Sequence, residues 1–474
     1  NHMKKYMAEH HINFYIINAT KLAQEIGLGN RTNTIMQSAF FKIADIIPYD
    51  QAVEEMRKFI IKSFGRKGEE VVNMNFAAVE QGGAVTRVEV PSEWADLGTE
   101  SKVDDRDIPE FIKNVVEPIN NLQGDDLPVS AFTGREDGTF PSGTSQYEKR
   151  GIAVNVPQWI GDNCIQCNQC AMVCPHAAIR PVLLTEEESK NAPDGFEVKK
   201  AVGKDLKEYS FRIQVDTLDC YGCGNCADIC PAKKKALVMK PLETQMPLQA
   251  PLWEYFETLP VRDDLVSRTT VKGSQFCQPL LEFSGACAGC GETPYAKLIT
   301  QLFGERMLIG NATGCSSIWG GSAPAVPYCV NKDGFGPTWG NSLFEDSAEF
   351  TYGMLLGTFQ QRNKLADLMR EAVGSDIPAD IKAAMSGWLE NMKDPEGSRK
   401  YGDQLKALLP AQKDNALLAK IAGKSKLFTK KSFWIFAGDG AAYDIGYGGV
   451  DHVLATGEDI NMLIMDTEVY SNTC

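Results

Sequence analysis

Two short cysteine runs constrain this 474-residue chain more than any other feature of its sequence. Both have the spacing C-x2-C-x2-C-x3-C, and a proline follows each run at once. The eight cysteines are Cys164, Cys167, Cys170 and Cys174 in the first run and Cys220, Cys223, Cys226 and Cys230 in the second. Thiolates spaced in this way let one loop wrap three corners of a cube-shaped metal group, with a fourth ligand close behind.

This spacing is the one with which bacterial ferredoxins hold two [4Fe–4S] clusters, the fourth cysteine of each run binding the cluster of the other run. The rule predicts a set A of Cys164, Cys167, Cys170 and Cys230 and a set B of Cys220, Cys223, Cys226 and Cys174. Zinc is the alternative, but its sites usually show two separated pairs of ligands. Disulfides are disfavoured further, because free thiolates imply a reducing compartment. The pattern therefore predicts a chain that moves electrons one at a time.

Charge and hydropathy exclude several other classes of function. The net charge of −14 argues against a nucleic-acid partner, because little positive charge is available to neutralise phosphates. No apolar run reaches the length of a membrane span, and the start of the chain has no signal-peptide core. We therefore expect a cytoplasmic protein with no membrane association. Residues 1–3 are interpreted as a cloning remnant before Lys4.

The first third of the chain shows alternating strand and helix patterns. An apolar run at 11–18 predicts a buried strand, and helical spacing follows at 19–26, 36–47 and 49–64. This alternation predicts an α/β unit. Prolines among acidic and glycine-rich stretches at 91–143 then predict a connector that lies over other domains.

Beyond the connector, a ferredoxin-like segment is followed by a second α/β pattern. A polar stretch at 185–208, between the two cysteine runs, is expected to be a solvated loop. Charged helical stretches at 359–430 are expected to form an exposed scaffold. Buried strands are predicted at 432–436 and 462–465, as part of a βαβ unit.

A glycine-bracketed aspartate follows the first of those two strands, at the end where open parallel sheets bind ligands. The turn is Gly438-Asp439-Gly440, and Thr467 and Val469 follow the second strand. Mg²⁺ prefers hard oxygen ligands shared between protein and phosphate. Asp439, Thr467 and the Val469 carbonyl could supply them, and the glycines would let the backbone approach a diphosphate. Alone, such a triplet is a weak signal.

Six cysteines remain outside the two runs. Only Cys287-Ala-Gly-Cys290, the third cysteine motif, has paired ligand spacing. For Cys277 and Cys329 an ordinary buried position is favoured. His176 could donate to a cluster sulfur, but a packing role is favoured for it.

Together these motifs resemble the pyruvate:ferredoxin (or flavodoxin) oxidoreductases, a family of thiamine diphosphate-dependent 2-oxoacid oxidoreductases. The resemblance spans nearly the whole chain, in the order of the family. The matching stretches are 29–37, the two cysteine runs, 284–295, 311–317 and 438–472.

The resemblance implies a role for each matched residue. Cys287, Cys290 and Cys315 correspond to three ligands of a third [4Fe–4S] cluster close to thiamine diphosphate, and Glu292 and Cys315 to residues that contact this cofactor. Asp439, Thr467 and Val469 correspond to the Mg²⁺ ligands, and Asn472 to a catalytic residue beside the reacting centre. The cofactor-binding residues implied around the diphosphate are Gly438, Asp439, Gly440, Ala441, Thr467 and Asn472.

The implied fold is a multidomain α/β protein. Its parts would be the end of an α/β gamma-type domain at 1–102, a connector at 103–143, a 2[4Fe–4S] ferredoxin-like α+β domain at 144–260, and a doubly wound thiamine diphosphate-binding domain at 261–474 that is incomplete at its C-terminus.

Two departures from the family bear on the site. The family's fourth ligand of the third cluster lies beyond the segment that ends here, and Cys474 as a surrogate is an open question. The amino-terminal domain that grips the aminopyrimidine is also missing, so the sequence is interpreted as an internal fragment of a longer, single-chain enzyme.

The resemblance implies oxidative decarboxylation of pyruvate with coenzyme A to acetyl-CoA and CO₂. Electrons would pass through three [4Fe–4S] clusters to ferredoxin or flavodoxin, and the intact enzyme would be a homodimer. A related 2-oxoacid, such as 2-oxoglutarate or an aryl pyruvate, is an alternative substrate. A non-catalytic electron-transfer module, similar to a polyferredoxin, is the alternative for the isolated fragment.

Overall fold

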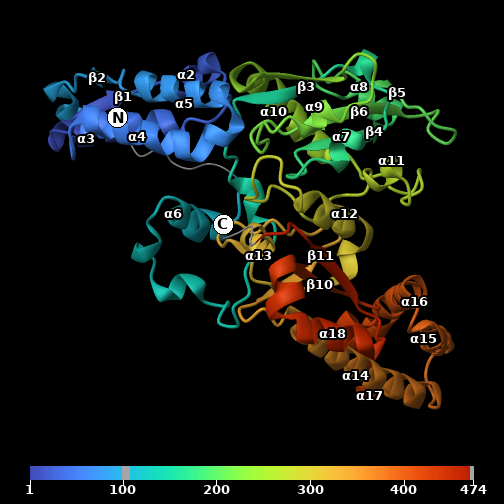
Figure 1. The fold of residues 1–474 in the computed structure, drawn as a ribbon. Coiled ribbons are helices and arrows are strands. Elements are labelled where there is room, and N and C mark those ends of the chain that lie inside the picture. Colours follow the sequence, from blue (N-terminus) through green and yellow to red (C-terminus); the bar gives the residue numbers. More distant parts are fainter. Residues whose placement is uncertain (99–106, 470–474) are drawn as a thin grey trace. The chain divides into compact units, whose positions relative to one another are not determined.

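The computed structural model describes residues 1–98 and 107–469, and the chain divides into one compact unit up to Asp107 and another from Ile108 onward (Figure 1). Each unit has its own core, and the two are described in turn. Among the described residues, no helix is both long enough and apolar enough to cross a membrane.

The first unit is built mainly from helices. Helix α3 packs against α5. Gly82 lets the two helices approach so closely that a Cβ at this position would lie 2.4 Å from the carbonyl oxygen of Ile35. The Ser38 hydroxyl donates to the Val79 carbonyl oxygen at 2.6 Å and joins the same two helices. The helices are α1 His2–Glu9, α2 Ala19–Ile26, α3 Asn33–Ala44, α4 Tyr49–Phe64 and α5 Glu69–Gly82.

The predicted helices of this unit are confirmed, two of them to the residue; a strand also forms within the predicted run at 11–18, but the expectation that it is buried is wrong. Strand β1, Phe14–Ile16, has only three residues, and Ile16 is 50% exposed. It pairs antiparallel with β2, Thr86–Val88. The described residues of this unit therefore form no parallel α/β layer, because the strand within the apolar run pairs antiparallel with a distant three-residue strand.

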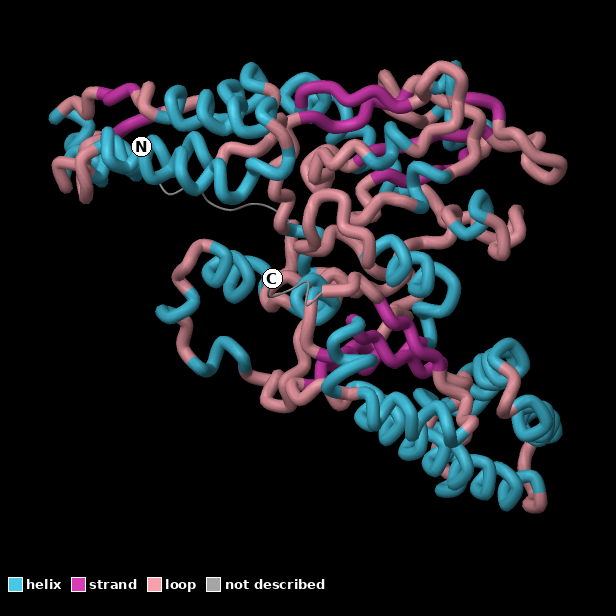
Figure 2. Tube along the Cα trace, in the orientation of Figure 1, coloured by secondary structure: helices cyan, strands magenta, loops and turns pink. Residues whose placement is uncertain are grey.

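The ferredoxin-like part consists of two similar halves. In the first half strand β3, helix α7 and strand β4 follow one another; in the second, β6, α9 and β7 do so. Strand β3 pairs antiparallel with β7, and β4 pairs antiparallel with β6, so each half completes the other's sheet (Figure 2). The bounds are β3 Asn155–Trp159, α7 Gln169–Met172, β4 Ile179–Leu184, β6 Ser210–Val215, α9 Asn225–Asp228, β7 Leu237–Pro241 and α10 Leu242–Thr258.

The stretch 185–208 is folded, and the expectation of a solvated loop there is wrong. Helix α8, Glu186–Lys190, begins with a capping box in which the Thr185 hydroxyl and the Glu188 carboxylate each accept from the other residue's amide. Strand β5, Lys199–Lys200, joins β6. Phe196 and Leu206 are buried in the neighbouring core, so a few apolar residues anchor a stretch whose composition is polar.

The segment before the ferredoxin-like part consists of short helical turns, including α6, Glu117–Asn120. Its end is tied to the later part of the chain, where the Ser145 hydroxyl donates to the Glu282 carbonyl oxygen at 3.0 Å. The amide of Gly143 also donates to the Tyr328 carbonyl oxygen at 2.8 Å.

Four parallel strands form the sheet of the last part of the chain, in the order β11-β10-β8-β9. Both predicted strands are confirmed within β10 and β11, although β11 at the edge is half-buried. Because β9 and β10 lie on opposite sides of β8, the chain reverses its winding between β8 and β10. The bounds are α12 Thr293–Phe303, β8 Met307–Ala312, α13 Cys315–Gly321, β9 Thr338–Ser342, β10 Ser432–Gly438, α18 Tyr447–Thr456 and β11 Asn461–Met465.

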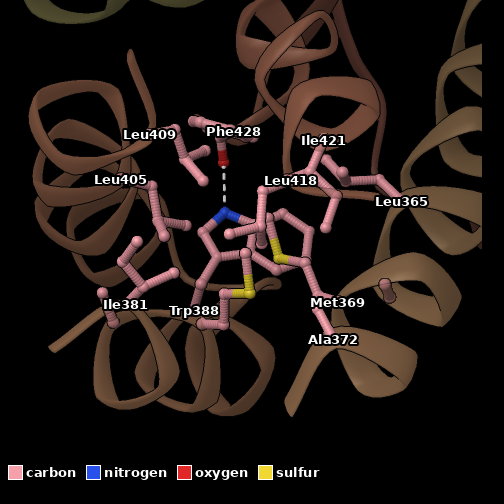
Figure 3. Close-up of a cluster of buried hydrophobic side chains, with 13 residues drawn as sticks. Leu365, Met369, Ala372, Ile381, Trp388, Leu405, Leu409, Leu418, Ile421 and Phe428 are labelled. Atoms are coloured by element: carbon pink, nitrogen blue, oxygen red, sulfur yellow. Dashed lines mark hydrogen bonds between the residues drawn. The ribbon is translucent and has the colours of Figure 1, made fainter. Parts of the chain in front are cut away.

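A helical insertion separates β9 from β10 and has a core of its own around Trp388 (Figure 3). The indole N–H of the fully buried Trp388 donates to the Phe428 carbonyl oxygen at 2.8 Å. The predicted helices are therefore confirmed, but the expectation of a merely exposed scaffold is wrong, because their apolar faces converge. The helices are α14 Ser347–Val373, α15 Ala379–Asn391, α16 Pro395–Leu408 and α17 Ala416–Ala422.

Candidate functional site

The structure brings the fourth cysteine of each run together with the first three of the other. Burial, together with the nearby Cys164, Cys167 and Cys230, raises the pKa of Cys170 to about 12. Each of these residues belongs to set A.

Set B is gathered in the same way around Cys226. Burial raises the pKa of Cys226, and the next largest contributions come from Cys174 and Cys220. Cys174 also acts on Cys223. Cys174 thus lies among the cysteines of the second run and Cys230 near those of the first, as the spacing rule predicts.

The backbone repeats the same unusual turn in both runs. The second residue after the leading cysteine is left-handed in each, with φ of 59° at Gln166 and 69° at Gly222. This conformation turns the amide back, so that Gln166 and Gly222 each donate to the sulfur of their leading cysteine at 3.4 Å. In the first run a non-glycine residue adopts the strained angle, and its buried side chain is held by the carbonyl of Lys200 and the amide of Val202 at 2.8 Å.

The sulfur arrangement fits a polynuclear group better than a single ion. Tetrahedral zinc, with Zn–S bonds of about 2.3 Å, would draw four sulfurs to within about 3.8 Å of one another. Within the described parts of the chain, no three His, Cys, Asp or Glu side chains are gathered closely enough to hold one metal ion. The eight buried or half-buried thiols also need a positive group to ionise, because burial and the neighbouring cysteines raise the pKa of Cys220 to about 12. These observations fit two iron–sulfur clusters.

The third cysteine motif has the same local turn. Gly289 has a φ of 78° and occupies the position of Gln166 and Gly222 relative to its leading cysteine. Cys290 and Cys315 pack against one hydrophobic cluster beneath the parallel sheet, whereas Cys287 is exposed. The structure therefore brings Cys290 of this loop and Cys315 at the start of α13 to one hydrophobic cluster.

Gly289 also brings the third motif against set B. A Cβ at Gly289 would lie 3.7 Å from the Cβ of Cys223, and the Gly289 amide donates toward the Cys223 thiol, which lowers its pKa against the larger effect of burial.

His176 forms a second connection between these loops. Its Nε2 lies 2.9 Å from the Ala286 carbonyl oxygen, and its ring stacks on Tyr221 with centroids 3.8 Å apart. Burial lowers the pKa of His176 to about 4, so the ring is neutral and Nε2 must carry the proton that the carbonyl accepts. The favoured packing role is confirmed.

The predicted oxygen ligands of Mg²⁺ converge at the carboxyl edge of the parallel sheet. The Thr467 hydroxyl lies 3.5 Å from the Asp439 carboxylate and donates to the Val469 carbonyl oxygen at 3.0 Å. Asp439 follows β10 and Thr467 follows β11, and the parallel register from Trp434 to Gly438 places both strand ends together. A carboxylate, a hydroxyl and a carbonyl at one edge are the donor set that Mg²⁺ prefers.

The predicted cofactor contacts lie close to the reversal in winding. Cys315 begins α13 directly after β8, and Asp439 begins the π-helical turn Gly440–Ile445 directly after β10. Open α/β sheets bind ligands in the crevice at such a reversal. Ala441 is buried in the same turn. Asn472 and Cys474 lie outside the described residues.

Glu292 lies between the third motif and the sheet edge. Burial raises the pKa of its carboxyl; hydrogen bonding from Trp319 lowers it, and the nearby Asp439 raises it further. The Trp319 indole donates to Glu292 Oε2 at 2.8 Å. Nothing in the sequence around Trp319 indicated that its indole would meet a carboxylate 27 residues away.

Comparisons with known proteins match the same segments. Family models match residues 2–85 (pyruvate ferredoxin/flavodoxin oxidoreductase), 163–234 (4Fe-4S dicluster domain) and 361–417 (pyruvate-ferredoxin oxidoreductase, insertion domain). A model described as a domain of unknown function matches residues 99–153.

The relatives resemble the chain over nearly its whole length. A pyruvate:ferredoxin oxidoreductase of Moorella thermoacetica is 55% identical over 99% of the chain, and a pyruvate-flavodoxin oxidoreductase of Enterobacter agglomerans is 54% identical over 99%. A pyruvate dehydrogenase [NADP(+)] of Euglena gracilis is 46% identical over 99%. The chain spans 41% of the first relative, 40% of the second and 26% of the third.

Proposed function

The chain belongs, over the stretch that it covers, to the pyruvate ferredoxin/flavodoxin oxidoreductase family, and we propose that it serves the oxidation of pyruvate with coenzyme A to acetyl-CoA and CO₂. In this proposal the chain carries electrons singly toward ferredoxin or flavodoxin. The observation that carries the proposal is the contact of the third cysteine motif with set B. The oxygen atoms of Asp439 and Thr467 lie in the same compact unit.

At the sheet edge, we propose that Asp439, Thr467 and the Val469 carbonyl hold Mg²⁺ against a diphosphate. Gly438 and Gly440 bracket the aspartate and present no side chain to the phosphates. Bound thiamine diphosphate would supply the carbanion for addition to the 2-oxo carbon and the electron sink for the decarboxylation.

The role proposed for Glu292 is to hold a proton beside that cofactor. Burial raises the pKa of its carboxyl, which makes a proton easier to hold there than on an exposed glutamate. Trp319 fixes one carboxyl oxygen through the 2.8 Å hydrogen bond and leaves the other free to face the cofactor.

The proposed electron route begins at the third motif, passes to set B and continues to set A. Gly289 contacts Cys223 of set B, and Cys170 of set A lies close enough to Cys226 of set B to influence its pKa. Iron–sulfur clusters suit this route because they accept single electrons over a wide range of potentials.

Metal analysis tests the cluster assignment directly. The protein carrying this chain, purified without air, should contain about eight iron atoms per chain if sets A and B are loaded, and about twelve if the third cluster forms too. Pyruvate should reduce the clusters when coenzyme A, thiamine diphosphate and Mg²⁺ are present. Zinc in place of iron, or clusters that the oxoacid leaves oxidised, would contradict the proposal.

Two alternatives give different outcomes in the same assays. A related 2-oxoacid oxidoreductase would be reduced faster by 2-oxoglutarate or an aryl pyruvate than by pyruvate. The exposure of Cys287 favours a non-catalytic electron-transfer module for the chain alone. Such a module would contain about eight iron atoms, and no oxoacid would reduce it.

A further inference from the structure

The two halves of the ferredoxin-like part each use a lysine at matching backbone positions. Lys297 Nζ donates to the carbonyl oxygens of Met172 at 3.2 Å and Cys174 at 3.0 Å. Lys235 Nζ donates to those of Asp228 at 2.8 Å and Cys230 at 3.0 Å. In both cases the acceptors are the fourth cysteine of the run and the residue two positions before it.

The two lysines differ in their surroundings. Lys235 is exposed on the loop that follows its own run, whereas Lys297 comes from α12 and is only 2% exposed. Charges in the protein interior act more strongly on one another than charges screened by water. At the two matching positions, the buried Lys297 therefore acts more strongly on nearby charges than the exposed Lys235 does.

The hydrogen bonds of Lys297 define its charge. A third acceptor, the Ala171 carbonyl oxygen, completes three donated bonds, and only the ammonium form has three N–H groups. All three acceptors are neutral carbonyls.

Lys297 Nζ donates to the carbonyl oxygen of Cys174 itself, a member of set B. Toward set A it contacts only Ala171, the residue that follows Cys170. The nearby cation Arg180 is paired with Glu282. Lys297 is thus a buried positive charge in direct contact with a residue of set B.

We propose that Lys297 is a positioning residue for electron transfer, which raises the reduction potential of the set B cluster above that of set A. This rests on the cluster assignment made above. The step is the gain of one electron by the cluster, with no bond made or broken, and oxidation of the oxoacid supplies the electron. A nearby cation stabilises the more negative, reduced cluster, so set B, which contacts the third motif, accepts the electron in preference to set A.

Redox titration of the cluster-loaded chain, followed by electron paramagnetic resonance, tests the proposal. Lys297→Met should reduce the equilibrium constant for reduction of the set B cluster about tenfold, a downward shift of about 59 mV for one electron. The set A cluster should move less. Lys297→Arg should keep the equilibrium constant for reduction of the set B cluster within about twofold of its original value. Lys235→Met, which removes the exposed lysine, should change the equilibrium constant for reduction of the set A cluster by no more than about twofold.

An unmoved set B potential in Lys297→Met, or equal shifts in Lys297→Met and Lys297→Arg, would overturn the proposal, since the effect would not follow the charge. Lys297→Gln gives a second neutral variant. If neither neutral variant loads iron, the order of the two potentials in the unsubstituted chain is the test. Cys226→Ser changes the signal of the set B cluster and so identifies it. That cluster must have the higher potential, and a higher potential for set A overturns the proposal. Absence of iron from the unsubstituted chain would refute the cluster assignment itself, a separate outcome.

Discussion

Gly289 lies against Cys223, with its amide directed toward the cysteine sulfur and only 3.7 Å between a Cβ at Gly289 and the Cβ of Cys223. The two residues belong to cysteine motifs far apart in the sequence. Their contact joins the loop at the parallel sheet to the ferredoxin-like part, which is the first step of the proposed electron route.

Gly289→Ala should disturb this contact. A side chain at a φ of 78° costs about 1–2 kcal/mol, and the loop would relax away from Cys223. Hydrogen bonds to sulfur tune cluster potentials, so the set B potential should fall while set A is unchanged in a redox titration. Gly291→Ala is the matched control, because a Cβ there meets nothing within 4 Å. Equal behaviour of the two variants would rule out a special role for the Gly289 turn.

Asp439→Asn should weaken Mg²⁺ binding at the sheet edge at least tenfold, a loss of about 1.4 kcal/mol, because the amide replaces the one charged oxygen ligand of the set. Titration with Mn²⁺ as a paramagnetic probe, with thiamine diphosphate present, measures this loss. Asp466→Asn tests whether any nearby carboxylate suffices, since Asp466 instead accepts from the Glu468 amide at 3.1 Å. The same loss in both variants would contradict the assigned role of Asp439.

Trp388→Ala should destabilise the helical insertion by about 3–5 kcal/mol, the range for removal of a large buried aromatic side chain. The variant also leaves the Phe428 carbonyl oxygen without its 2.8 Å donor. Denaturant unfolding measures the effect. Trp388→Phe, which keeps most of the ring volume, should lower the free energy of unfolding clearly less. Equal losses in the two variants would show that the packing around Trp388 is not the cause.

Lys431→Gln should stabilise the protein at neutral pH. Burial lowers the pKa of Lys431, and the cations Lys406 and Arg362 lower it further. The unfolded chain therefore binds this proton more tightly than the folded chain. The cost is fully present below the folded pKa and disappears as the pH rises to the ordinary value of about 10.5.

Thermal unfolding at several pH values checks this sign. The melting temperature of Lys431→Gln should exceed that of the unsubstituted protein at pH 7, with a difference that shrinks toward pH 10.5. Lys420→Gln, at an exposed lysine that does not act on Lys431, should show no comparable trend. A difference that grew with pH would contradict the lowered pKa.

Local patterns in the sequence predicted much of the fold. Helices at Ala19–Ile26 and Tyr49–Phe64 begin and end where the periodicity of apolar residues does. The cysteine spacing also predicted how the two runs cross, since a loop that holds three corners of a cube leaves the fourth to its partner.

Local patterns failed where burial depends on distant partners. The polar stretch at 185–208 is anchored by Phe196 and Leu206, and the apolar β1 is left exposed at Ile16. Composition reports an average over a segment, whereas one or two residues that reach a core are enough to fix it.

The sequence alone determined the cysteine turns and the Asp439 turn, because the spacing of ligands and glycines along the backbone sets which groups can face one ion or cluster. Only the tertiary structure decided that Trp319 meets Glu292, that Gly289 meets Cys223, and that Lys297 lies buried behind Cys174. These contacts join segments far apart in the chain, and the strength of a charge or hydrogen bond depends on how completely packing excludes water around it.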